Sequence, residues 1–183
     1  ATEREHSLGN VLVRNMLEAG FKGKLFAVNP KYDQVFGVPC YKSVEDIPQR
    51  LDLVVITTKA DRVPAIVDAC GRAGTKAAVV IPSGFADAGP RGKMLEKNTV
   101  ENARRHRIRL LGPNCLGVLR PELGLNASFA RGGAIKGSIG LISQSGALCS
   151  AILDWARPNN VGFSSVISLG TSVDVDFGEA LEY

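Results

Sequence analysis

Small, polar and basic residues follow each of four short aliphatic runs in this sequence. Hydroxyl and amide side chains can hydrogen-bond a ligand, and small residues let its atoms approach the backbone. Ligands of open α/β sheets bind beyond the carboxyl ends of the strands. The alternative is that these are ordinary turn residues of a parallel sheet. The predicted ligand-binding residues are Asn29, Pro30 and Lys31, then Thr57, Thr58 and Lys59, then Ser83 and Gly84, and finally Asn114.

A second group of candidates stands where the first helix is expected to begin. Ser7 can cap this helix, and it is followed by Leu8, Gly9 and Asn10. The free amides and the positive dipole end of a helix N-terminus favour phosphate. A complete G-x-G-x-x-G pattern is not present, because no strand and turn precede this helix in the sequence. The alternative is that Ser7 is only a cap and Gly9 only a packing residue.

Asn29 and Lys31 bear on the type of nucleotide. NAD sites usually carry Asp or Glu at the end of the second strand, where the carboxylate holds the ribose hydroxyls. This sequence has Asn29 there and Lys31 two residues later. A cation at this position favours a phosphorylated ribose, which occurs in NADP and in coenzyme A. A solvated surface lysine is the alternative.

The segment Ser143, Gln144, Ser145 and Gly146 lies between an expected strand and an expected helix. It does not match the G-x-S-x-G pattern of a nucleophile elbow. We interpret it as an anion cradle in which amides and hydroxyls face a phosphate or carboxylate. We therefore predict no catalytic residue in this segment.

Neither histidine is expected to serve as a catalytic base. His106 stands among Arg104, Arg105 and Arg107 at the end of an expected helix, and we predict that it is solvated. The four cysteines are too widely spaced for a zinc site, so no metal site is predicted. We expect four separate reduced thiols in a cytoplasmic protein.

The elements that must position these residues alternate between strands and helices. Nearly continuous aliphatic runs predict strands at 24–28, 51–57, 76–81 and 108–111. Helical patterns lie between them, at 7–20, 61–73 and 93–106, with a short helix at 44–47. Such units predict parallel strands joined by right-handed crossovers, and therefore an α/β, doubly wound fold.

The composition changes after Val118, where residues 119–137 are rich in glycine and basic residues and predict an irregular connector. A second βαβ unit follows, with strands at 138–142 and 163–168 and a helix at 146–156. We predict a first domain over 1–128, a connector over 129–137 and the start of a second domain over 138–183. The sequence begins with Ala1 and ends in a helical pattern, so we expect a longer polypeptide with a strand upstream of Ala1.

The overall composition excludes several classes of protein. The 183 residues are 45% apolar and 22% charged, which excludes a disordered chain. The net charge is only +4 and the basic residues are scattered, so a nucleic-acid partner is not predicted. The longest apolar runs have the length of strands, so a membrane partner is not predicted either.

An ordered series of motifs resembles the NDP-forming (ADP-forming) acyl-CoA synthetase family, which is related to the α subunit of succinyl-CoA synthetase. The resemblance covers essentially the whole sequence. The motifs are Val28-Asn29-Pro30-Lys31, Gly37-Val38-Pro39, Ser43-Val44-Glu45-Asp46-Ile47, Gly112-Pro113-Asn114-Cys115-Leu116-Gly117 and Ser143-Gln144-Ser145-Gly146-Ala147-Leu148. Two further motifs, Leu125-Asn126-Ala127-Ser128-Phe129 and Leu153-Asp154-Trp155-Ala156, are similar to a subgroup fused to a GNAT acetyltransferase domain.

The resemblance implies a CoA-binding Rossmann-like domain followed by a flavodoxin-like domain that is incomplete here. It implies that Ser7, Leu8, Gly9 and Asn10 touch the CoA phosphates and that Lys31 meets the phosphorylated ribose. Residues 57–59, with Ser83 and Gly84, would flank the nucleotide and the pantetheine arm, and Asn114 would lie near the thiol. The loop 143–146 would begin the helix that faces the phosphohistidine of the family.

That histidine lies beyond Tyr183 in the family, so we expect CoA or acyl-CoA binding without turnover by these residues alone. ATP or ADP and Mg²⁺ would bind only to the parent protein. The downstream partner would be an ATP-grasp domain in a ligase, or a GNAT domain in an acyl-CoA-sensing acetyltransferase. An NADP-binding oxidoreductase domain is a further alternative. An open sheet edge in the second domain would favour self-association.

Overall fold

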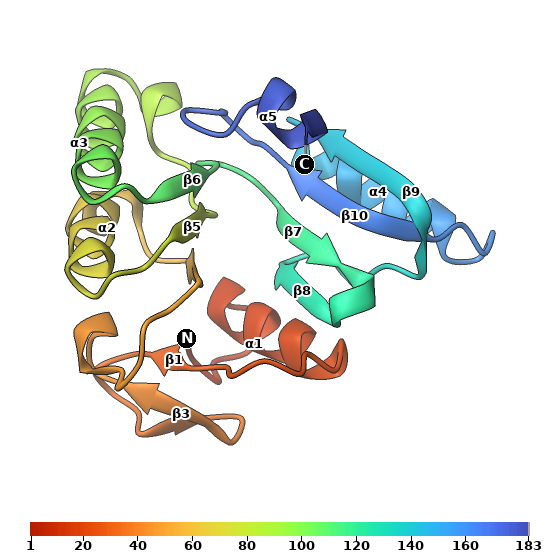
Figure 1. Ribbon diagram of the computed structural model, residues 1–183, viewed down its shortest axis with the longest axis horizontal. Coiled ribbons are helices and arrows are strands. Elements are labelled where there is room, and N and C mark those ends of the chain that lie inside the picture. Colours follow the sequence, from red (N-terminus) through yellow and green to blue (C-terminus); the bar gives the residue numbers. More distant parts are fainter. Residues whose placement is uncertain (183) are drawn as a thin grey trace. The chain divides into compact units, whose positions relative to one another are not determined.

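The computed structural model describes residues 1–182 and divides the chain into two compact units. The first unit combines Ala1–Ser43 with Leu116–Ser168. The second unit combines Val44–Cys115 with the segment that starts at Leu169. Each unit is therefore built from two stretches that are far apart in the sequence. Figure 1 labels the helices and strands of both.

In the first unit, helix α1 (Leu8–Glu18) covers a small three-stranded sheet. Ser7 caps the helix, because its hydroxyl oxygen accepts a hydrogen bond from the N–H of Asn10 at 3.3 Å. The sheet order is β1-β3-β2, with β1 parallel and β2 antiparallel to β3. Val13 of the helix packs with Ala27, Val35 and Val38 of the strands. The strands are β1 (Ala27–Val28), β2 (Gln34–Val35) and β3 (Val38–Tyr41).

The first unit also contains a four-stranded sheet in the order β8-β7-β10-β9. Strand β10 is parallel to β9 and antiparallel to β7. Helix α4 (Gly146–Ala156) packs against β9 and β10, and α1 lies beside β8 (Figure 1). Cys149 and Leu153 of α4 share a buried cluster with Leu119 and Val166 of the sheet. The strands are β7 (Gly117–Arg120), β8 (Leu125–Ser128), β9 (Lys136–Ser143) and β10 (Phe163–Ser168).

The predicted irregular connector over 119–137 is wrong in its first half. Strands β7 and β8 form an antiparallel hairpin there, joined by the 3-10 helix η4 (Pro121–Leu123). The hairpin lacks the aliphatic run that marks the other strands, because Asn126 and Ser128 are buried at 4% and 0% exposure. A hydrogen bond between the Ser128 hydroxyl and Asn126 Oδ1, at 2.6 Å, makes this burial tolerable.

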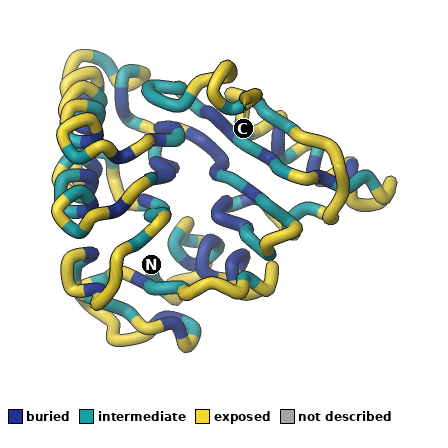
Figure 2. The backbone as a smooth tube through the Cα atoms, viewed as in Figure 1, coloured by how far each residue is buried: buried dark blue, intermediate teal, exposed yellow. Residues whose placement is uncertain are grey.

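The second unit is a parallel sheet covered by two helices. Strands β4, β5 and β6 are hydrogen-bonded in that order, and all are parallel. Helices α2 and α3 lie side by side (Figure 1). Figure 2 shows their outer turns exposed. Val63, Val67 and Ala103 of these helices are buried. The bounds are β4 (Leu53–Ile56), β5 (Ala77–Val80), β6 (Arg109–Leu111), α2 (Val63–Arg72) and α3 (Pro90–His106), with 3-10 turns η1 (Val44–Asp46), η2 (Ala60–Arg62) and η3 (Ala86–Ala88).

The segment after Leu169 returns to the second unit and runs along β6. The N–H groups of Val173 and Val175 donate to the carbonyls of Gly112 and Leu110, at 3.3 and 3.1 Å. The Arg109 guanidinium binds the carboxylates of Asp174 and Glu179 at 3.1 and 2.7 Å. Glu179 belongs to helix α5 (Phe177–Glu182), so this cation fixes the end of the described chain to β6.

The α/β class predicted from the sequence is confirmed, with strands close to the predicted positions. The strand expected at 24–28 is shorter, because β3 offers only Cys40 and Tyr41 as ladder partners for Ala27 and Val28. The helix expected at 93–106 begins at Pro90, since proline is tolerated in the first turn of a helix. The predicted domain boundaries stay a prediction. Among the described residues, every helix is too short or too polar to span a bilayer.

The sequence predicted a solvated His106, and this prediction is wrong. The side chain instead joins helices α2 and α3. Its Nε2 lies 2.8 Å from the Asp68 carboxylate, and its side chain is 22% exposed. Asp68 also pairs with Arg72, which in turn binds Glu45 at 2.9 Å. Gly71 leaves room for the imidazole, because a Cβ there would lie 2.1 Å from the His106 ring. The hydrogen bond with His106 and the charge of Arg72 lower the pKa of Asp68 against a smaller opposing effect of burial.

This network predicts an acid-sensitive second unit. A carboxylate with a lowered pKa stabilises the fold above its unfolded pKa and loses that contribution as pH falls through the folded value. We expect Asp68→Asn to lower the urea midpoint at pH 7, and the difference from the unaltered chain to vanish well below the ordinary pKa of 3.8. Asp154→Asn, at an exposed site without an ion pair among the described residues, is the control. A difference that persists unchanged at pH 2 would contradict the prediction.

Candidate functional site

Two predicted groups of ligand-binding residues lie in the first unit and are tied together by the segment before α1. The amino group of Ala1 donates to the carbonyl of Val28 at 3.0 Å. The side-chain amide of Asn29 donates to the carbonyl of Ala1 at 2.6 Å. The segment that leads into Ser7 is therefore hydrogen-bonded to the carboxyl end of β1.

The four residues at the start of α1 differ in their accessibility. Leu8 is exposed, Ser7 and Gly9 are half-buried, and Asn10 is 6% exposed. The Asn10 amide donates to the carbonyl of Glu3 at 2.9 Å, so this side chain supports the preceding loop. The first turn of α1 contains no acidic residue, so no carboxylate neutralises the positive end of the helix dipole. This end of the helix is therefore suited to an anion.

Lys31 and Asn29 form a turn at the end of β1. The side-chain oxygen of Asn29, Oδ1, accepts a hydrogen bond from the backbone N–H of Lys31 at 3.0 Å. The Lys31 side chain is exposed and has no ion-pair partner among residues 1–182. An exposed, uncompensated ammonium can bind a phosphate with little rearrangement of the protein.

Three other predicted groups lie at one edge of the sheet in the second unit. Thr57, Thr58 and Lys59 follow β4, Ser83 and Gly84 follow β5, and Asn114 follows β6. The three strands are parallel, so their carboxyl ends share an edge. The N–H of Asn114 donates to the carbonyl of Pro82 at 3.0 Å, which joins the last two groups directly.

Most of these side chains are available to a ligand. Thr58, Lys59, Ser83 and Asn114 are exposed, whereas Thr57 and Gly84 are half-buried. Lys59, like Lys31, has no ion-pair partner in the part of the chain that the structure describes. The edge thus offers hydroxyls, an amide and one cation, a set that can bind phosphate and polar ligand groups.

The loop 143–146 lies in the first unit and partly satisfies its own donors. The Ser143 hydroxyl accepts from the N–H of Ser145 at 3.1 Å, and the Ser145 hydroxyl caps α4 by accepting from the N–H of Leu148 at 3.2 Å. Gln144 is exposed, and Gly146 opens the helix. The helix start is formed as predicted, and its role as an anion cradle stays a prediction.

Acid–base chemistry has little support at these positions. His106 is engaged with Asp68. Cys40, Cys70, Cys115 and Cys149 form no disulfide within residues 1–182. Burial raises the pKa of Cys70 to about 11, which disfavours the reactive thiolate. Residues 1–182 contain no group of three His, Cys, Asp or Glu side chains suited to a metal ion. The arrangement is suited to binding and orienting a ligand.

Parallel sheets with polar residues at their strand ends are typical of Rossmann-like proteins that bind phosphorylated ligands. Comparison with known families makes the assignment specific. Residues 1–121 match the CoA binding domain, and residues 136–183 match the succinyl-CoA ligase like flavodoxin domain. The chain therefore belongs to the CoA-binding domain family, as the motifs predicted.

Relatives of known activity match the whole chain. It is 45% identical to acetate–CoA ligase [ADP-forming] I of Archaeoglobus fulgidus and covers 26% of that protein. It is 38% identical to the α subunit of acetate–CoA ligase [ADP-forming] I of Pyrococcus furiosus and covers 40% of it. The chain thus spans less than half the length of these relatives.

A solved structure gives the same result. The dinucleotide forming acetyl-coenzyme A synthetase 1 of Ca. Korarchaeum cryptofilum, solved with phosphate and ADP, superposes with a TM-score of 0.95 at 39% identity. The match covers all of this chain and 39% of that one. These relatives are acid–CoA ligases or synthetases. They therefore favour the ligase prediction over the acetyltransferase and NADP alternatives.

Proposed function

We propose that this chain binds coenzyme A as the amino-terminal part of a cytoplasmic ligase that joins an organic acid to CoA while ATP is converted to ADP and phosphate. The observation that carries the proposal is the match of residues 1–121 to the CoA binding domain. Every predicted contact residue except the loop 143–146 lies within this range. The similarity to ADP-forming ligases over the full chain supports the reaction class.

The first unit would hold the charged parts of CoA. The uncompensated N-terminus of α1, with Ser7, Leu8, Gly9 and Asn10, would face the diphosphate. Lys31 would bind the phosphate on the ribose, next to the turn formed by Asn29 and Pro30. Charge-assisted hydrogen bonds of this kind are the strongest that the exposed surface can offer.

The residues that follow β4, β5 and β6 would contact further parts of CoA. Thr57, Thr58 and Lys59, together with Ser83 and Gly84, offer hydroxyls, backbone amides and one cation for the nucleotide and the pantetheine arm. Asn114, held by its backbone bond to Pro82, would lie near the thiol. The loop 143–146 would face an anion at the start of α4.

These residues would bind and orient the thiol, and the rest of the ligase would activate the acid. In this proposal the phosphorylated histidine, the ATP or ADP with Mg²⁺, and the ATP-grasp domain belong to the rest of the ligase. The engagement of His106 by Asp68 supports this division, because that imidazole is not available to carry phosphate.

Isothermal titration of the chain with CoA, acetyl-CoA and NADPH tests the proposal. We expect CoA and acetyl-CoA to bind with dissociation constants below about 1 mM, and NADPH to bind at least about ten-fold more weakly. Binding of NADPH without binding of CoA would overturn the proposal in favour of an oxidoreductase domain. The absence of binding by all three ligands would overturn it as well.

A further inference from the structure

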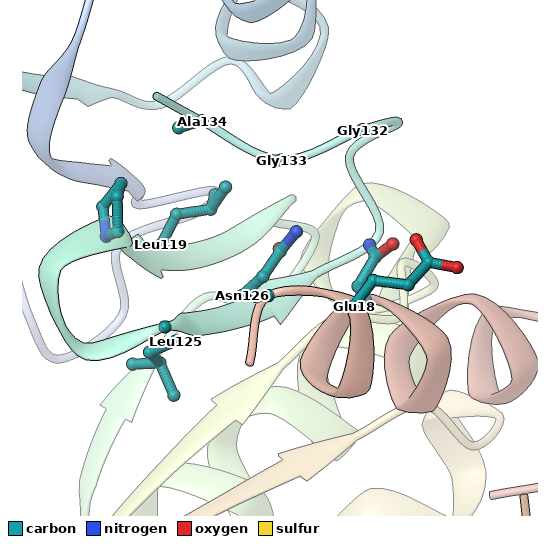
Figure 3. Close-up of a pocket in the computed structure, with 11 residues that line it drawn as sticks. Glu18, Leu119, Leu125, Asn126, Gly132, Gly133 and Ala134 are labelled. Atoms are coloured by element: carbon teal, nitrogen blue, oxygen red, sulfur yellow. The ribbon is translucent and has the colours of Figure 1, made fainter. Parts of the chain in front are cut away.

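The first unit contains a cavity of about 240 Å³ at the C-terminal end of α1, away from the helix start discussed above. Figure 3 shows it between α1, the hairpin β7–β8 and the loop that contains Gly132 and Gly133. All lining residues belong to this unit. They are Asn15, Glu18, Ala19, Leu119, Pro121, Gly124, Leu125, Asn126, Gly132, Gly133 and Ala134.

Two buried amides line the cavity, and both are held by Ser128. Asn15 and Asn126 are 7% and 4% exposed. The Asn15 Nδ2 group donates to the carbonyls of Ser128 and Ala130, at 2.8 and 2.9 Å. The Ser128 hydroxyl donates to Asn126 Oδ1 at 2.6 Å. These bonds fix which end of each amide is occupied.

The other end of each amide has no hydrogen-bond partner among residues 1–182. Asn126 Nδ2 remains as a donor and Asn15 Oδ1 as an acceptor. Figure 3 shows the Asn126 nitrogen pointing towards the loop at Gly132 and Gly133. A Cβ built on Gly133 would lie 3.4 Å from this nitrogen, so the glycine leaves it uncovered. Neither atom is among the buried side-chain atoms that lack a partner, so both are reached from the cavity and can bind a polar occupant there.

The charge of the cavity restricts that occupant. Glu18 contributes a carboxylate, and the end of α1 contributes the negative pole of the helix dipole. Arg14 pairs with Glu18 at 3.8 Å, but both side chains are exposed and such pairs are weak. The Arg157 guanidinium lies beside Gly132, where it donates to the carbonyl of Arg131 at 2.7 Å. Leu119, Pro121 and Leu125 add an apolar wall. Glu18 and the helix end favour a molecule that presents N–H donors to that side of the cavity, and the apolar wall favours a flat one.

We propose that this cavity binds a small planar molecule with an amidine edge, in which a ring or imine nitrogen stands beside an amino group. Asn126 Nδ2 donates to the nitrogen acceptor, and the amino group donates to Asn15 Oδ1 or to the Glu18 carboxylate. Aminopurines and aminopyrimidines carry this edge in uncharged form. A protonated amidine offers only N–H donors, which can bind Asn15 Oδ1 and the Glu18 carboxylate but not Asn126 Nδ2. This is a second ligand site, independent of the proposed CoA contacts.

Titrations of the intact chain with adenine, benzamidine and benzoate test the proposal by ligand-observed NMR, with and without saturating CoA. We expect adenine and benzamidine to bind with millimolar or lower dissociation constants, and benzoate at least about ten-fold more weakly. Binding that persists with CoA present separates this site from the proposed CoA contacts. Failure of both adenine and benzamidine to bind would overturn the proposal, because water alone would then fill the cavity.

Two variants locate the binding. Glu18→Gln keeps the shape of the side chain, so we expect benzamidine to bind about five-fold more weakly and adenine to change less than about two-fold. Glu101→Gln is the matched control, because Glu101 also forms an exposed i,i+4 pair at 3.8 Å, with Lys97. Asn126→Ala should weaken adenine about ten-fold. If Asn126→Ala does not fold, the affinity of Glu18→Gln for benzamidine tests the proposal instead. Unchanged benzamidine binding by Glu18→Gln would overturn the proposal.

Discussion

Replacing Gly92 with alanine is expected to destabilise the second unit by about 2 kcal/mol. Gly92 is buried in the first turns of α3. A Cβ on this residue would lie 1.7 Å from the carbonyl oxygen of Phe85, a backbone atom that cannot rotate away. Forcing such contacts apart costs about 3 kcal/mol, and the better helix propensity of alanine returns about 1 kcal/mol.

The same substitution should also weaken CoA binding. Phe85 is 1% exposed and directly follows Ser83 and Gly84, so movement of its backbone would displace these proposed contact residues. Urea unfolding followed by circular dichroism measures the stability, and titration measures the affinity. Gly178→Ala in α5 is the control, because its nearest neighbour is a side-chain atom, Asp176 Oδ1 at 3.3 Å, and not the backbone. Equal urea midpoints for Gly92→Ala and the unaltered chain would contradict the prediction.

Strands of the parallel sheets could be predicted because burial on both faces requires an aliphatic run. Residues 53–56 and 77–80 are such runs, and the structure places β4 and β5 there. The parallel arrangement also placed polar residues at a common edge, which the bond between Asn114 and Pro82 illustrates. Each of these strands could be predicted from its own residues alone, because the aliphatic run lies within the strand itself.

The hairpin β7–β8 could not be predicted in this way. Its inward positions include Asn126 and Ser128, which are buried and hydrogen-bonded to each other through Oδ1 and the hydroxyl. The partner of Ser128 is Asn15, 113 residues earlier in the sequence. Such a pair is visible only once α1 and β8 lie side by side. The signal that was present is the glycine pair Gly132 and Gly133, since both residues adopt positive φ angles, of 74° and 67°.

His106 illustrates the same limit for charged residues. Its neighbours Arg104, Arg105 and Arg107 favoured a solvated side chain, since a run of cations usually faces water. The pairing with Asp68 depends on Gly71, whose missing side chain lets the imidazole approach α2. The neighbouring arginines therefore did not predict the environment of His106, because its partner lies on another helix.

Lys31→Ala is expected to weaken CoA binding about ten-fold and to change the affinity for dephospho-CoA by less than about two-fold. This prediction rests on the proposed function. Dephospho-CoA lacks only the ribose phosphate, so the comparison isolates the contact assigned to the Lys31 ammonium. That ammonium is exposed and has no ion-pair partner among the described residues, so its loss leaves no buried charge. The difference between the two ligands should shrink as salt is added, because exposed charges are screened.

Lys22→Ala is the matched control for this experiment. Lys22 is also an exposed lysine of the first unit, but it follows the C-terminal end of α1 and not the end of β1. We expect it to change the affinity for either ligand by less than about two-fold, since a distant exposed charge contributes little. Equal weakening of CoA and dephospho-CoA by Lys31→Ala would remove the ribose-phosphate role from Lys31, even where CoA binding itself is retained.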